Sequence, residues 1–234
     1  MMIEPSTRDF EAPARRDEHE GEGATRGTAR MEAFADGVFA IAFTLPIVGV
    51  AIPAIERPGA LLAHDLAQHA PSFGGYALAS LVIGLYWVHH HFSGAIYRTT
   101  GHWFLLATVL FLTLIGFVAY PARVFAEHFT DAAARPAAAQ FWVVALTATS
   151  CAWLFKWTVG YARGQVDPRL EPDYVRRLNQ TYWLLAIVNL LAAGLVFWWW
   201  PAGVALSAIA LLVLMKPPET PRYQVEAPIV EGES

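Results

Sequence analysis

The amino-acid sequence predicts an all-α fold, that of a polytopic integral membrane protein with six transmembrane helices. Hydrophobic residues make up 56% of the 234 residues and charged residues only 15%, whereas about a quarter of the residues in a soluble domain are charged. The apolar residues are collected in six stretches, and a bilayer-spanning helix needs about 20 such residues. This composition excludes an ordinary soluble enzyme. A net charge of −4 gives no electrostatic reason to expect a nucleic-acid partner.

The six apolar stretches are the predicted transmembrane helices, the last of which is short for a bilayer. Between the fifth and the sixth lies the run Trp-Trp-Trp-Pro at residues 198–201. Tryptophan is enriched at membrane surfaces and proline permits a sharp reversal. We therefore expect a hairpin here, with one long kinked helix as the alternative. The stretches cover residues 32–55, 71–92, 102–126, 137–160, 178–198 and 200–215.

Polar segments flank these helices. Residues 1–29 interleave acidic and basic side chains, and residues 217–234 are rich in Pro and Glu. Neither segment has the apolar residues that a packed core requires. We expect two disordered cytoplasmic tails around one transmembrane domain at residues 30–216.

Basic residues predict the orientation of the chain. Most Lys and Arg residues lie in the two tails and in the loops after the second and fourth stretches, and few lie in the other loops. By the positive-inside rule, both termini then lie in the cytoplasm. Lys156 falls near the cytoplasmic end of the fourth stretch, where we expect its side chain to reach the membrane surface.

Polar residues within apolar helices are informative because burying them is costly. The first stretch carries Asp36 about 6–7 Å from its cytoplasmic end, and the second ends with Trp87 and three His at residues 89–91. The two helices run in opposite directions, so we expect one polar layer on the cytoplasmic side if they are neighbours. Its members would be Arg30, Asp36, Trp87 and His90. For Asp36, a purely structural carboxylate near the helix N-terminus is the alternative.

The run of three His residues could suggest a metal site. Successive side chains on a helix are rotated by about 100°, so three consecutive His cannot face one centre. No second cluster of metal-ligating residues accompanies them, and a membrane di-iron or zinc enzyme needs more ligands. We therefore expect no metal, no cofactor and no enzyme activity. A membrane enzyme that uses the His run with a metal stays as an alternative.

One face of the first stretch is continuously apolar. Helical spacing aligns Phe34, Val38, Ile41, Leu45, Val48 and Ile52 along it. The simpler explanation is a face that packs on neighbouring helices or on lipid. The other is the wall of a pore whose narrow points are apolar rings, which can gate by dewetting. Pro46 removes a backbone hydrogen bond, so we expect a bend there. The scarcity of charge near the midplane argues against a secondary transporter, the remaining alternative.

The first stretch also carries a long motif. Residues 30–45 resemble the R-x-x-x-F-S-D-G-V-F-A-I-A-x-T-L signature of the transmembrane protein 175 family of potassium channels. Trp87 with His90, Arg98 and the end of the third stretch are similar to later blocks of that family, so that the resemblance covers about residues 30–127. This chain has Ala35 in place of the motif serine and Thr100 in place of an acid.

The resemblance implies a homotetramer in the bilayer of a prokaryotic cell membrane, with the first helix of each subunit around a central axis. It implies passive conduction of potassium ions, and proton leak, without a cofactor. Ile41 would form the narrowest layer, with Leu45 and Val48 further out. The side chains that would hold the inner ends together are Arg30, Phe34, Ala35, Asp36, Trp87 and His90. Because Ala35 replaces the motif serine, a non-conducting member of the family is an alternative.

Overall fold

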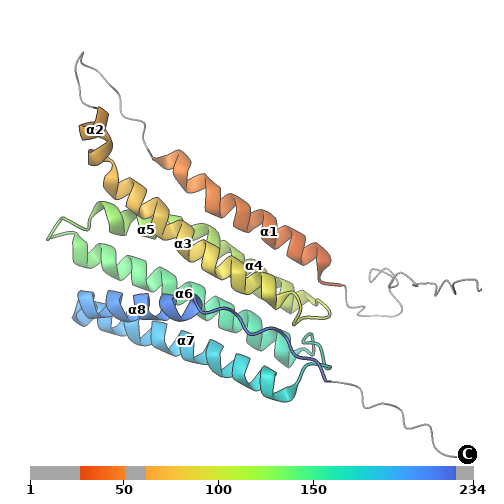
Figure 1. Cartoon of the computed structure of the whole chain (residues 1–234). Helices are drawn as coiled ribbons and strands as arrows, with labels where there is room; N and C mark the ends of the chain where they lie inside the picture. The colour runs from red at the N-terminus through yellow and green to blue at the C-terminus, as the bar shows by residue number, and fades with distance from the viewer. Residues whose placement is uncertain (1–26, 51–61, 225–234) are drawn as a thin grey trace, which may run out of the picture.

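The computed structural model describes residues 27–50 and 62–224, and these residues form an antiparallel helical bundle without a sheet (Figure 1). Five helical segments are long and apolar enough to cross a membrane, and a shorter apolar helix follows them. The elements are α1 (Ala29–Thr44), η1 (Leu45–Gly49), α2 (Leu62–Gln68), α3 (Ala70–Ser93), α4 (His102–Phe117), α5 (Ala119–Glu127), α6 (Arg135–Ala162), α7 (Pro172–Trp198) and α8 (Trp200–Leu214). All six predicted stretches are therefore helical where the structure describes them.

The helices differ from the predicted stretches mainly at their ends. The first α-helix stops at Thr44 and continues as the 3-10 helix η1, because Pro46 has no N–H to donate. Residues 51–55 of that stretch lie outside the described residues. Helix α7 begins six residues early at Pro172, since its polar first turns are solvated and Asp173 pairs with Arg176 at 3.2 Å.

The core of the bundle is aromatic and centres on α6. Trp153 and Trp157 of α6 are buried, and the ring of Trp153 lies 5.0 Å from that of Phe111 in α4. Helix α6 packs against α4 and α5 on one side and against α7 and α8 on the other. Helix α1 packs against α3 and α4 and lies along one edge of the bundle (Figure 1). Among the described residues, one face of α1 is therefore left without a partner.

The last two helices form the predicted hairpin, so the alternative of one kinked helix is wrong. Trp199 adopts an extended conformation (φ −145°, ψ 92°) between α7 and α8. The two helices approach closely at Gly203, where an added Cβ would lie 2.5 Å from the Cα of Val196. The hairpin therefore depends on the missing side chain at residue 203.

Residues 217–224, part of the predicted C-terminal tail, lie against the ends of the helices. Glu219 pairs with Arg177 of α7 at 3.2 Å, and the Tyr223 hydroxyl donates to the carbonyl of Ala95 at 2.7 Å. Residues 1–26 and 225–234, the remainder of the two tails apart from a few residues before α1, lie outside the described residues.

Asp167 lies where two connections meet, at the end of the bundle where α1 begins. The backbone N–H of Asp167 donates to the carbonyl of Ile96 at 2.8 Å, which links the α6–α7 connection to the α3–α4 connection. The Asp167 side chain is 6% exposed and accepts from Arg169 Nη2 at 2.7 Å and from Arg169 Nε at 3.1 Å. The Arg169 guanidinium holds the pKa of Asp167 below its ordinary value of 3.8.

We predict that Gly203→Ala lowers the free energy of unfolding by about 1–3 kcal/mol, because the methyl group meets the backbone of α7. Thermal unfolding in detergent measures the effect. Gly194→Ala is the matched control, since a Cβ there meets nothing within 4 Å, and it should be neutral or stabilising by up to about 1 kcal/mol. Equal effects of the two changes would contradict the close approach.

We predict that acid weakens the connection held by Asp167. A folded-state pKa below the unfolded value gives stability that is present above pH 3.8 and is lost as the pH falls through the lower folded value. Asp167→Asn should lower the thermal midpoint at neutral pH and should flatten its decline in acid. The measurement is the thermal midpoint of both proteins across this pH range. A parallel decline in the two proteins would show that another group is responsible.

Candidate functional site

Helix α1 has one buried face and one exposed face. The buried face consists of Met31, Ala35, Phe39 and Ala42, which pack toward α3 and α4. On the other side, Ile41 and Leu45 are each 58% exposed and Val48 is 77% exposed. The three residues predicted to line a pore therefore share a face that no helix within residues 27–50 and 62–224 covers. Phe34, which was expected to help hold the inner end, lies on this exposed face as well.

The exposed face continues into an open groove beside α1. The groove has a volume of about 380 Å³ and lies between α1 and the junction of α4 with α5. Its α1 side includes Ile41 and Leu45, and Gly116 and Tyr120 form part of the opposite side. The apolar surface of α1 is thus broader than the single stripe that periodicity predicts.

The expected bend at Pro46 takes the form of a change in helix type. The Thr44 hydroxyl donates to the carbonyl of Ala40 at 2.8 Å, which engages a carbonyl near the end of α1. The chain then continues as the more tightly wound 3-10 helix η1, where the N–H of Val50 donates to the carbonyl of Ile47 at 3.0 Å. A 3-10 helix has a longer rise per residue than an α-helix, so Val48 lies further along the axis than an α-helix would place it.

The structure brings together one pair of the predicted polar layer. Trp87 Nε1 of α3 donates to Asp36 Oδ1 of α1 at 3.1 Å. Arg30 is exposed, and among the described residues no hydrogen bond or ion pair joins it to Asp36. His90 is buried and faces Phe39 of α1, with 5.5 Å between the ring centroids. The expected layer is therefore divided into an exposed pair at the edge of the bundle and a histidine in its interior.

The prediction that Lys156 reaches the membrane surface is wrong. Its side chain is 1% exposed, and Nζ lies 4.9 Å from the ring centroid of Trp153 and 5.3 Å from that of Tyr97. Helix α6 continues for six residues beyond Lys156, about 9 Å at 1.5 Å per residue. The rings of Tyr97 and Phe104 cover the path to the surface that sequence position alone suggests.

The three consecutive His side chains point into different surroundings, as helical rotation predicts. His89 Nε2 donates to the carbonyl of Leu214 at 2.8 Å, His90 points inward, and His91 is exposed beside Trp87. Within the described ranges, no group of three or more His, Cys, Asp or Glu side chains is arranged to hold a metal ion.

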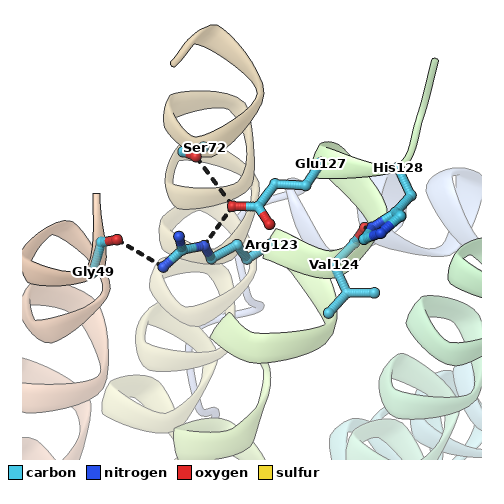
Figure 2. Close-up of polar contacts among 6 residues, drawn as sticks. All are labelled: Gly49, Ser72, Arg123, Val124, Glu127 and His128. Atoms are coloured by element: carbon cyan, nitrogen blue, oxygen red, sulfur yellow. Dashed lines mark hydrogen bonds and ion pairs between the residues drawn. The ribbon is translucent and has the colours of Figure 1, made fainter. Parts of the chain in front are cut away.

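Arg123 anchors the far end of the exposed helix, and sequence reasoning missed it. Figure 2 shows Arg123 Nη1 donating to the carbonyl of Gly49 at 2.7 Å and Nε pairing with Glu127 Oε1 at 2.6 Å. Glu127 also accepts from the hydroxyl of Ser72 in α3 at 3.1 Å. The four-residue spacing of Arg123 and Glu127 predicts their ion pair. The hydrogen bond to the carbonyl of Gly49 cannot be predicted from the sequence, because the acceptor is a backbone group. The end of η1 is thus joined to α3 and α5.

Comparisons with known proteins agree with this geometry. A family model described as "Endosomal/lysosomal potassium channel TMEM175" matches residues 30–118. This chain is 31% identical over 188 residues to a potassium channel of Streptomyces collinus, covering 80% of this chain and 90% of that one. It is 35% identical over 117 residues to a potassium channel of Chamaesiphon minutus, covering 49% of this chain and 57% of that one.

A solved structure is similar over most of the bundle. It is the crystal structure of a lysosomal potassium-selective channel TMEM175 homolog from Chamaesiphon minutus, with a TM-score of 0.65 and 26% sequence identity. The similarity covers 80% of this chain and 95% of that chain. The range matched by the family model contains α1 from Arg30 onward, η1 and α3. It therefore includes every residue of the predicted stripe up to Val48 as well as the Asp36–Trp87 pair.

We predict that Arg123→Lys loosens η1. A lysine ammonium cannot reproduce the fork that reaches Gly49 and Glu127 together, so backbone hydrogen exchange in residues 45–50 should become faster. The thermal midpoint should change little, because an ion pair this exposed is worth about 0.2–1 kcal/mol. Arg176→Lys, in the exposed ion pair with Asp173 on α7, is the control and should leave exchange in η1 unchanged. Equal exchange in the two variants would overturn the anchoring role of Arg123.

Proposed function

The chain belongs to the TMEM175 family of potassium channels, and from that premise we propose that it conducts potassium ions passively through a pore lined by α1 of four subunits. Its helices make it a multi-pass membrane protein. The proposed activity has no chemical step and requires no cofactor. Both termini face the cytoplasm in this proposal, as the distribution of Lys and Arg predicts.

The observation that carries the proposal is the uncovered apolar face of α1. Ile41, Leu45 and Val48 are among the exposed large hydrophobic residues. They belong to α1 and η1, within the range that the family model matches, and α1 lies along one edge of the bundle (Figure 1). Four copies arranged around an axis would bring these faces together, remove them from lipid and place them along a narrow pore. Symmetric homo-oligomers of this kind are the common form of protein assembly.

The chemistry of the face explains how it could select an ion. A narrow ring of apolar side chains offers no ligand, so an ion passes only by giving up part of its hydration shell. A smaller monovalent cation holds its water more strongly, which favours potassium over sodium. We assign the narrowest layer to Ile41, with Leu45 about 6 Å further along the helix and Val48 beyond it.

The polar residues of α1 position this wall in the proposal. The bond from Trp87 to Asp36 fastens the inner part of α1 to α3. Ala35 is fully buried, so the absence of the motif hydroxyl changes packing within the subunit and not the surface of the pore. Phe34 and Arg30 are exposed near the start of α1 and would lie toward the cytoplasmic mouth.

We predict that Ile41→Ala weakens selectivity for potassium over sodium by roughly fivefold, equivalent to about 1 kcal/mol, because a smaller side chain leaves ions more of their water. Cation flux into liposomes that hold the purified protein measures this, with potassium, sodium and proton gradients compared. Leu190→Ala is the matched control, since Leu190 is 54% exposed on α7, and it should conduct like the wild type.

Native mass spectrometry of the same preparation tests the tetramer. A folded tetramer that passes no cation would identify a non-conducting member of the family and would contradict the proposed conduction. A monomer that conducts would contradict the arrangement of four α1 helices around an axis. An equal effect of Ile41→Ala and Leu190→Ala would remove Ile41 from the pore.

A further inference from the structure

The interior of the bundle contains a lysine enclosed by aromatic rings. Lys156 Nζ lies 4.9 Å from the ring centroid of Trp153, 5.3 Å from that of Tyr97 and 6.0 Å from that of Phe111. Aromatic faces attract a cation, and the attraction is stronger where water is absent. The rings come from α6, from the connection after α3 and from α4. The ammonium therefore lies where several parts of the chain meet.

The hydrogen-bond partner of this ammonium is His90 of α3. Lys156 Nζ lies 3.3 Å from His90 Nδ1, within hydrogen-bond distance. The other ring nitrogen, His90 Nε2, is buried without a hydrogen-bond partner in the described structure. His90 is also fixed by its neighbour, because Nδ1 lies 3.2 Å from the hydroxyl of Ser93. The orientation of the imidazole is thus set by Lys156 on one side and by its own helix on the other.

Two ring contacts of Phe39 join this centre to α1. The ring of Phe39 lies 5.5 Å from that of His90 and 6.2 Å from that of Phe111. Both of these partners contact Lys156. Phe39 lies two residues before Ile41 on the same helix, and its side chain is buried whereas that of Ile41 is exposed. A shift of Phe39 therefore moves the wall that Ile41 is proposed to form.

A carboxylate on α1 lies near this centre. Glu32 is close to Gly94, in the connection that also supplies Tyr97. Its Oε1 atom is buried and lacks a hydrogen-bond partner among the described residues. The carboxyl group lies close to Gly94, where a Cβ would be 3.3 Å from Glu32 Oε1. We take this buried, unsatisfied carboxyl oxygen at the inner end of α1 as the negative counterpart of Lys156.

Such an arrangement is costly if its only task is packing. Replacing buried ionic groups by apolar side chains of similar volume is often neutral or stabilising, and ionisable groups inside a membrane protein mark functional positions. We propose that Lys156 is a positioning residue for conduction: acting through His90, Phe111 and Glu32, its cation holds the inner end of α1 in the register that the pore requires. The flux part of this inference rests on the proposed function, and the placement of α1 does not.

The variant Lys156→Met tests the inference because it removes the cation and keeps the length of the side chain. We expect potassium flux to fall at least about fivefold, which is roughly 1 kcal/mol. We also expect faster hydrogen exchange at the backbone of residues 29–44, with the thermal midpoint kept or raised. Glu32→Gln should act in the same direction. The double variant should be no worse than Lys156→Met, since coupled groups give non-additive effects.

Ser207→Ala is the matched control. Ser207 is as deeply buried as Lys156, and its hydroxyl has no hydrogen-bond partner in the described structure, but it belongs to α8. Its replacement should change neither flux nor exchange in α1. If Lys156→Met does not fold, Glu32→Gln decides alone, and wild-type flux and exchange in that variant overturn the inference.

The two readouts separate this inference from the proposed function. A conducting wild type with unchanged flux and unchanged α1 exchange in Lys156→Met overturns the positioning role only. A wild type that passes no cation overturns conduction, whereas faster α1 exchange in Lys156→Met still supports the link between Lys156 and α1. Strictly additive effects of Lys156→Met and Glu32→Gln would also overturn the link, because they would mean that the two charges act independently.

Discussion

The contact of Phe39 with His90 and Phe111 is the interaction on which the placement of α1 depends. Helix α1 packs against α3 and α4 through only four buried residues, of which two are alanines. Phe39 is the largest of the four, and its ring lies within 6.2 Å of both partner rings. The small residues allow the helices to approach closely, a feature of packing in membranes. The aromatic contact then decides how far α1 extends from the rest of the bundle.

Polar contacts to other helices fasten both ends of the segment formed by α1 and η1. Trp87 donates to Asp36 toward the inner end, and Arg123 donates to the carbonyl of Gly49 at the outer end. Between them, the exposed side chains of Ile41 and Leu45 are apolar. A helix held at two ends can adjust its central side chains without detaching from the subunit. In the proposed pore, this arrangement would suit a constriction that passes ions one after another.

Sequence reasoning succeeded where a residue pattern has one geometric meaning. The helical period aligned Ile41, Leu45 and Val48, and opposite helix directions brought Asp36 to the depth of Trp87; the structure bears out both placements. It failed for Lys156, because the snorkelling rule uses distance along one helix and ignores rings supplied by others. It could not find the contact of Arg123 with Gly49. Every residue has a backbone carbonyl, so the sequence does not indicate which carbonyl accepts a given hydrogen bond.

Helix α8 gives the subunit an uneven thickness. Its 15 residues measure about 22 Å at 1.5 Å per residue, whereas the hydrocarbon core of a bilayer is about 30 Å thick. The adjoining α7 has 27 residues and has no such deficit. The bilayer beside α8 must become thinner, or Lys216 at the end of α8 must extend toward the headgroups. Each subunit therefore presents a thinner border to the membrane at α8 than at α7, and in the proposed tetramer the surrounding lipids would meet alternating thick and thin borders.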